Sequence, residues 1–412
     1  MLSRRVFLKN SALAMFGVGS APAWLGRALY AKSAPSERKK ILIVIFQRGA
    51  VDGMNVVVPH GEPAYYTLRP SIAIPRPNGS KEAAIDLDGR FGLHPSLEAL
   101  KPLWDNRQLA IVEAVGSPDP TRSHFDAQDY MESGTPGVKA TLDGWLNRAL
   151  CAEPHASSVR AVSLGPDLPR TLRGKNEAVA IASLRDFQVK DARLAETFES
   201  MYGTSPDRIL NGAGRETFET MKIVQSIQKT PYVPANGARY PNGQLGRSLE
   251  QIACMIKAGV GLEVAFTDVG GWDTHVNEVG PQPHTGRLSN LLRDFGDALG
   301  AFSQDMGDRM GDIAVVTMSE FGRTVKENGD RGTDHGHANL MFVLGGGVRG
   351  GKVYGDWPGL EAEQLYQGRD LNVTTDFRTV LSELVLKQMG NREIATVFPG
   401  FPARTSRGIL SA

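Results

Sequence analysis

Residues 41–46 read ILIVIF, an uninterrupted apolar run that is followed by the turn-forming sequence QRGAVDGMN of residues 47–55. A short, wholly apolar run between turn residues is typical of a strand that is buried on both faces, as in parallel sheets. Asp52 follows this strand closely, and open α/β sheets bind their ligands at the carboxyl ends of their strands. The stretch therefore predicts a central strand and the edge of a functional site.

The same alternation of strand and helix returns along the chain. Four more strands are expected, at residues 109–115, 262–267, 313–317 and 340–347. Helices are expected at residues 246–260, 288–302 and 376–389, the second from its apolar side chains at intervals of three, four and seven. Strands alternating with helices predict a three-layer α/β/α sandwich with a mostly parallel central sheet.

Composition limits the class of protein. Apolar residues make up 41% of the 412 residues and charged residues 22%, which is typical of a folded globular chain. The 46 basic residues nearly balance the 45 acidic ones, so a nucleic-acid partner is not expected. There are only two cysteines, Cys151 and Cys254, and they lack the spacing of a cysteine zinc site. The sequence does not decide whether they form one disulfide with each other. Residues 35–412 are expected to form a single domain, with an irregular insertion or cap at about 165–245.

The N-terminus predicts export. In MLSRRVFLKNSALAMFGVGSAPAW, Arg4 and Arg5 precede a short, moderately apolar stretch, and SRRVFLK resembles the twin-arginine signal. The stretch is too short and too glycine-rich to span a membrane, so no stable span is expected in the mature chain. Residues 1–34 are therefore interpreted as a signal peptide and spacer, read by the twin-arginine translocase, and the mature protein is expected in the periplasm. The alternative is a short amphipathic or membrane-anchoring N-terminal helix.

Imidazoles and carboxylates gather in loops at the ends of predicted strands. Five of the eight histidines lie in three such loops: His124, His275, His284, His335 and His337. The carboxylates that accompany them are Asp52, Asp273, Glu320 and Asp334. These are the ligand types that zinc and manganese accept, and one or two ions would suit the activation of a hydroxyl or the stabilisation of a phosphoryl or sulfuryl oxyanion.

Each of these residues also has a simpler interpretation. An isolated DxH or DHGH is often a turn with local Asx hydrogen bonds. Asp52 could merely form the turn before Gly53, and Glu320 and Arg323 could be a structural ion pair. Trp272 is expected to pack under its turn. The metal-site hypothesis depends on the joint occurrence of the patterns at successive strand ends.

Six blocks of the chain resemble a known family. They are ILIVIFQRGAVDGMN, TRSHFDAQDYMESG, GGWDTHVNE, VVTMSEFGRT, GTDHGHANLMFVLGGGVRGG and TTDFRTVLSELV. In this order they are similar to the domain-of-unknown-function 1501 family, over about residues 40 to 390. That family belongs to the alkaline-phosphatase-like superfamily, with the sulfatases and the cofactor-independent phosphoglycerate mutases. The resemblance implies an alkaline-phosphatase-like fold.

The resemblance also implies metal-binding roles. Asp52 resembles the superfamily's aspartate after the first strand, and Asp273 and His275 resemble the Asp and His after a middle strand. His335 or His337, just before the strand at 340–347, resembles the last metal-binding histidine.

The chain departs from the superfamily at SEFG. Glu320 stands in place of the aspartate and Phe321 in place of the histidine of a DHG motif, and phenylalanine cannot ligate a metal. The second metal therefore depends on His124 or Asp334 as a substitute.

The resemblance places the nucleophile in the loop before a helix. Ser123 lies where the superfamily has Ser, Thr or formylglycine, and Thr121 is the second choice. Metal coordination would activate such a hydroxyl. His124 and Arg323 complete the catalytic candidates.

Three functions follow as hypotheses. The first is an exported metal-dependent hydrolase that acts on a small anionic phosphate or sulfate ester. The second is an exported binding or assembly protein that keeps the fold and a partial metal site without catalysis. A metal-dependent mutase or transferase is the third.

Overall fold

The computed structural model describes residues 39–151, 157–185, 208–228, 231–402 and 406–411. The predicted twin-arginine signal and spacer, residues 1–34, lie outside the described residues. Lys40–Ala412 forms one compact unit. Among the described residues, no helix combines the length and apolarity needed to cross a membrane.

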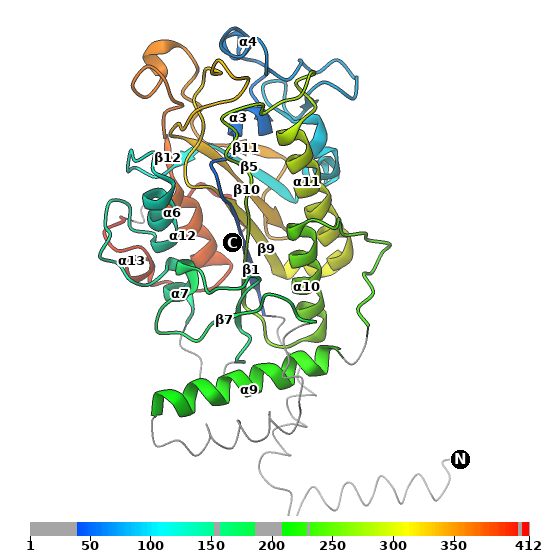
Figure 1. Cartoon of the computed structure of the whole chain (residues 1–412), viewed down its shortest axis with the longest axis vertical. Helices are drawn as coiled ribbons and strands as arrows, with labels where there is room; N and C mark the ends of the chain where they lie inside the picture. Colours follow the sequence, from blue (N-terminus) through cyan, green and yellow to red (C-terminus); the bar gives the residue numbers. More distant parts are fainter. Residues whose placement is uncertain (1–38, 152–156, 186–207, 229–230, 403–405, 412) are drawn as a thin grey trace, which may run out of the picture. The chain divides into compact units, whose positions relative to one another are not determined.

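A large mixed sheet forms the centre of this unit (Figure 1). Its strand order is β11-β5-β10-β9-β1-β8-β6-β7, and β12 also pairs with β5. The strands are β1 (Ile41–Gln47), β5 (Leu109–Gly116), β6 (Ala161–Ser163), β7 (Val179–Ala180), β8 (Val264–Val269), β9 (Ile313–Met318), β10 (Asn339–Gly345), β11 (Lys352–Tyr354) and β12 (Thr375–Asp376). The strand predicted at residues 41–46 is thus an inner strand, between β8 and β9.

The direction of the strands confirms the predicted mostly parallel sheet. β1 is parallel to β8 and β9, and β6 is parallel to β8 and β7. β10 is antiparallel to both β9 and β5, whereas β11 and β12 run parallel to β5. Because β10 alone opposes the other described strands of this sheet, the start of β10 lies at the same edge as the carboxyl ends of β1, β5, β8 and β9.

Two hydrophobic cores cover the two faces of the sheet. Along β1 the odd-numbered residues from Ile41 to Ile45 enter one core and the even-numbered residues from Leu42 to Phe46 enter the other, as the alternation of a strand requires. The first core packs against η1 (Pro95–Leu100), α5 (Lys101–Asp105), α9 (Arg208–Gln228), α10 (Gln244–Ala258) and α11 (Arg287–Met306). The second packs against α6 (His124–Ser133), α7 (Trp145–Ala149), α12 (Phe377–Lys387) and α13 (Ile394–Val397). The three-layer α/β/α class is confirmed (Figure 1).

Smaller elements complete the unit. A short antiparallel sheet follows β1 and contains β2 (Val57–Val58), β3 (Ile85–Asp86) and β4 (Gly92–Leu93), with α3 (Gly53–Val56) and α4 (Pro63–Leu68) beside it in the chain. The remaining short elements are the 3₁₀ helices η2 (Arg170–Leu172), η3 (Gly307–Asp312) and η4 (Ala362–Gln364). Part of the segment at 165–245 joins the main sheet, because β7 pairs with β6. Cys151 and Cys254 are free thiols.

Candidate metal centre

Four loops meet at the carboxyl edge of the large sheet. They follow β1, β5, β8 and β9, and the last of them leads into the antiparallel strand β10. The loops after β8 and β9 place imidazoles and carboxylates at this edge, and the loop after β5 leads into α6, which begins at His124. Residues that are far apart in the sequence therefore come together.

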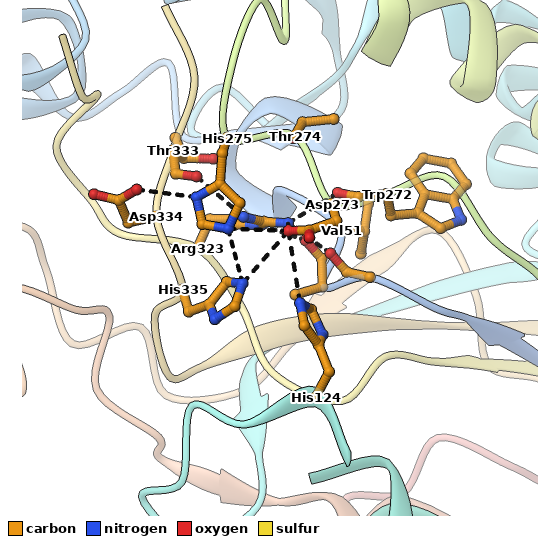
Figure 2. A network of polar contacts seen from close by, with 12 residues as sticks. Val51, His124, Trp272, Asp273, Thr274, His275, Arg323, Thr333, Asp334 and His335 are labelled. Atoms are coloured by element: carbon orange, nitrogen blue, oxygen red, sulfur yellow. Dashed lines mark hydrogen bonds and ion pairs between the residues drawn. The ribbon is translucent and has the colours of Figure 1, made fainter. Parts of the chain in front are cut away.

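Figure 2 shows three imidazoles around one carboxylate oxygen, Asp273 Oδ1. This oxygen lies 3.1 Å from His275 Nε2, 3.4 Å from His335 Nε2 and 3.6 Å from His124 Nε2. The Nε2 atoms of His275 and His335 are 2.9 Å apart. One ligand atom each from His124, Asp273 and His335 lies within 4.8 Å of the others. We call His124, His275, His335 and Asp273 the histidine–aspartate cluster.

The Nδ1 side of each ring is held by an acceptor. His124 Nδ1 lies 2.8 Å from Glu320 Oε1, His275 Nδ1 lies 3.0 Å from Asp334 Oδ1, and His335 Nδ1 lies 2.9 Å from the Arg122 carbonyl oxygen. Since carboxylates and carbonyls only accept, each Nδ1 donates its proton outward.

The neutral tautomers then leave a lone pair on each Nε2, and the lone pairs converge on Asp273. His124 Nε2 is buried and has no hydrogen-bond partner. Converging lone pairs repel one another unless a proton or a cation lies between them. Histidines oriented by outer acceptors in this way are the arrangement found in metal sites, so the residues present fit a divalent cation.

Two pKa values in the cluster are shifted, in opposite directions. Burial lowers the pKa of His335, which favours its neutral form. The hydrogen bond to Glu320 raises the pKa of His124, which favours its protonated form, so a cation and a proton compete for Nε2 of that ring.

Glu320 supports the cluster from behind. The carboxylate is buried, and its Oε1 accepts hydrogen bonds from His124, from Gln128 Nε2 at 2.9 Å and from Gly49 N at 2.8 Å. Burial alone would raise the pKa of Glu320, but these hydrogen bonds lower it below its ordinary value. Gln128 is one helical turn after His124 on α6, and that i,i+4 spacing was a sequence signal for its role.

Arg323 joins the loops around Asp273. Its Nε donates to Ala50 O at 2.6 Å, and its Nη2 donates to Gly49 O and Asp273 Oδ1, both at 2.6 Å. Its Nη1 donates to Thr333 O at 3.0 Å. Burial would raise the pKa of Asp273, but the hydrogen bond and charge of Arg323 lower it. The alternative of a Glu320–Arg323 ion pair is not what forms, because Arg323 pairs with Asp273 and Glu320 with His124.

Gly49 is needed where the loop after β1 approaches the loop after β8. Its φ of 116° is one that side chains rarely adopt, and a Cβ on it would lie 2.6 Å from the backbone nitrogen of Asp273. The glycine therefore allows these two loops to approach each other closely.

The structure corrects the positions of two predicted ligands. Asp52 lies in a buried ion pair with Arg69, whose Nη1 and Nη2 are 2.5 and 2.9 Å from its two oxygens. His337 turns away from the cluster, because its Nε2 donates to Ser117 O at 3.1 Å and its ring lies against Tyr366. Of the two histidines considered for this place, His335 lies in the cluster.

Asp52 belongs to a buried polar network behind the cluster. Glu278 Oε2 accepts from Thr274 Oγ1 at 3.0 Å and from Thr333 Oγ1 at 2.9 Å, which ties together the loops that carry the cluster. Burial and the neighbouring Asp52 raise the pKa of Glu278 well above its ordinary value, which favours its protonated form. Sequence reasoning missed Glu278 and Arg69, and no local pattern indicated either.

The other predicted residues lie around the cluster. Ser123 is exposed and caps α6, since its Oγ accepts from Asp126 N at 3.5 Å. The Phe321 ring packs against His124 and His335, with ring centroids 5.0 and 4.9 Å away.

Three further residues lie outside it. Thr121 Oγ1 accepts from Ser123 N at 3.2 Å. Trp272 is buried and packs against Phe295, as its packing interpretation expected. His284 lines a surface pocket whose lining includes no residue of the cluster.

Comparison with known proteins gives one family match. A model described as a protein of unknown function (DUF1501) matches residues 104–393. No curated protein matches the chain.

Among solved structures, the chain is similar to the lipoteichoic acid synthase LtaP from Listeria monocytogenes, with 10% identity, 76% of this chain and 68% of that chain covered, and a TM-score of 0.30. It is also similar to a protein of the alkaline phosphatase superfamily from Vibrio parahaemolyticus, with 11% identity, 75% of this chain and 60% of that chain covered, and a TM-score of 0.31. The third is the PsFucS1 sulfatase from Pseudoalteromonas sp., with 11% identity, 92% of this chain and 75% of that chain covered, and a TM-score of 0.38.

Proposed function

The chain belongs to the DUF1501 family of proteins of unknown function, and from its histidine–aspartate cluster we propose that it is an exported, metal-dependent hydrolase of small phosphate or sulfate esters. The observation that carries the proposal is the convergence of three Nε2 lone pairs on Asp273 Oδ1. The reaction class comes from the superfamily that the sequence blocks resemble.

The cluster residues have distinct tasks in this proposal. His124, His275, His335 and Asp273 would hold the ion, and three nitrogens with one oxygen suit zinc and also manganese. When bound, the ion would polarise an ester oxygen and lower the pKa of a hydroxyl at the site. Glu320, Asp334 and the Arg122 carbonyl keep the Nδ1 protons outward.

Ser123 is the nucleophile that we propose. It directly precedes His124, and it is exposed on the loop that enters the cluster. Its Oγ accepts the capping bond from Asp126 N, so the hydroxyl keeps its own proton for transfer.

A metal-binding protein without turnover is the second candidate. Two observations favour it: Ser123 Oγ already caps α6, and Phe321 fills the position of a superfamily histidine. Turnover by fully metallated protein decides between the two.

The test combines metal analysis with an ester panel. Protein purified without chelators is analysed for metal by mass spectrometry and assayed with p-nitrophenyl phosphate and p-nitrophenyl sulfate. We expect His335→Gln to lose bound metal and turnover. The matched control is His337→Gln, two residues away and outside the cluster, which should keep its metal. Equal metal content in the two variants would contradict the proposed site.

Ser123→Ala separates catalysis from binding. We expect it to abolish turnover with unchanged metal content, and the lost cap costs about 1 kcal/mol of stability. Metallated wild-type protein that turns over neither ester would support the binding-protein candidate.

Export rests on the N-terminal sequence, with Arg4 and Arg5 in the twin-arginine pattern. We propose that the mature protein is periplasmic and that the translocase is its partner during export.

A further inference from the structure

A negatively charged substrate needs a cation that it can reach, and Arg323 does not offer one. Its side chain is 0% exposed, and all three of its nitrogens donate to the carbonyls or the carboxylate around it. Arg323 therefore orients Asp273. A positive charge for a ligand beside the cluster must come from elsewhere.

Two other arginines are hydrogen-bonded to His335. His335 Nδ1 donates to the Arg122 carbonyl at 2.9 Å, and Arg369 Nη2 donates to the His335 carbonyl at 2.5 Å. The side chains of Arg122 and Arg369 are 28% and 44% exposed. Both guanidinium groups therefore belong to residues that contact the cluster and are open to solvent.

Asp370 pairs with both arginines and holds Arg122 by hydrogen bonds. Its side chain is 0% exposed, and its Oδ2 accepts from Arg122 Nε at 3.1 Å and from Nη2 at 2.5 Å. Its Oδ1 is 3.3 Å from Arg369 Nε. One carboxylate thus neutralises only one of two guanidinium groups, and the trio carries one net positive charge.

The trio also leaves donors for a ligand. Gln367 Oε1 accepts a further bond from Arg122 Nη2 at 3.0 Å, so the Nε edge of Arg122 is committed to the protein. The Nη1 groups of Arg122 and Arg369 have no hydrogen-bond partner within the described parts of the chain. Planar guanidinium groups with free N–H donors bind tetrahedral oxyanions well.

We propose that Arg122 and Arg369, held by Asp370, form an anion clamp that binds the phosphate or sulfate group of the ligand beside His335. This inference rests on the proposed function for the identity of the ligand, but not on turnover. Asp370 is a positioning residue in the clamp, since it sets the two guanidinium groups without facing the ligand itself.

The test measures anion binding directly. Inorganic phosphate and inorganic sulfate are titrated calorimetrically into wild-type protein and into Arg122→Gln and Arg369→Gln, each with its metal content recorded. We expect each clamp variant to bind phosphate about tenfold more weakly, because each loses one charged donor. Metal content should not change.

The control removes a comparable arginine elsewhere. Arg407 is 26% exposed and pairs with Asp356 at 2.9 Å, so Arg407→Gln removes the same charge from a similarly exposed arginine outside the clamp. We expect it to bind phosphate as the wild type does. Wild-type protein that binds neither anion at millimolar concentration would overturn the clamp, as would a loss of affinity no larger in the clamp variants than in Arg407→Gln.

Two readouts keep the clamp separate from the proposed function. If metal binds and neither ester is turned over, weakened phosphate binding in the clamp variants still supports the clamp. Should Arg122→Gln unfold, Arg369→Gln decides, because Arg369 is the more exposed of the two and its loss leaves Asp370 paired with Arg122.

Discussion

Replacing Asp52 with Asn tests whether this residue is a metal ligand or a structural partner of Arg69. The side chain of Arg69 is 0% exposed and that of Asp52 is 1% exposed, so the substitution leaves a buried guanidinium without its carboxylate. Removing one partner of a buried ion pair costs about 3–5 kcal/mol.

The neighbouring Glu278 decides how much of this unfolding free energy, about 3–5 kcal/mol, is lost. Because its pKa is raised by burial and by Asp52, loss of the Asp52 charge would let Glu278 ionise and partly replace it beside Arg69. We expect Asp52→Asn to lower the free energy of unfolding by about 3 kcal/mol. The double variant Asp52→Asn/Glu278→Gln should lower it by about 5 kcal/mol.

The assay is urea unfolding followed by circular dichroism, together with metal analysis of the folded protein. Asp356→Asn is the control, since Asp356 is 75% exposed in its pair with Arg407 and an exposed pair contributes about 0–1 kcal/mol. Unchanged stability with loss of bound metal in Asp52→Asn would refute the reasoning and restore Asp52 as a ligand.

Two further predictions concern pH and export. Burial lowers the pKa of His94 from 6.5 to about 3, where Nδ1 accepts from Ser96 N. Between pH 6.5 and 3 the unfolded chain therefore binds a proton that the folded chain does not, and stability falls by about 1.4 kcal/mol per pH unit as pH decreases. Urea unfolding at pH 7 and pH 5 should show a steeper loss in the wild type than in His94→Gln, and equal slopes would contradict it. Replacing Arg4 and Arg5 with lysines should keep the precursor in the cytoplasm, because the translocase distinguishes guanidinium from ammonium groups; cell fractionation that finds normal periplasmic accumulation would reject the signal.

The fold was largely predictable because it depends on local patterns. The apolar runs gave the strands, and the turn residues after them gave the edge at which Asp273, His275 and Glu320 lie. The direction of β10 was not predictable, since an apolar run carries no sign of its orientation in a sheet.

The details of the site depend on contacts between distant segments. The DHGH sequence offers His335 and His337 equally, and the choice is made by the isolated bridge of His335 with Arg323 and by the Arg122 carbonyl. In the same way, Asp52 looked like a free ligand because Arg69, its partner, lies beyond α3 and α4, and only the folded chain brings them together.

The position of β1 has a consequence for synthesis on the ribosome. Leu42 pairs with Val264 on one side and Ile41 with Ile313 on the other, so β1 is flanked by strands that are made more than 200 residues later. Such non-local pairing slows folding. The apolar β1 lacks these neighbours until β9 has left the exit tunnel, and we expect its exposed apolar residues to be prone to aggregation during that time.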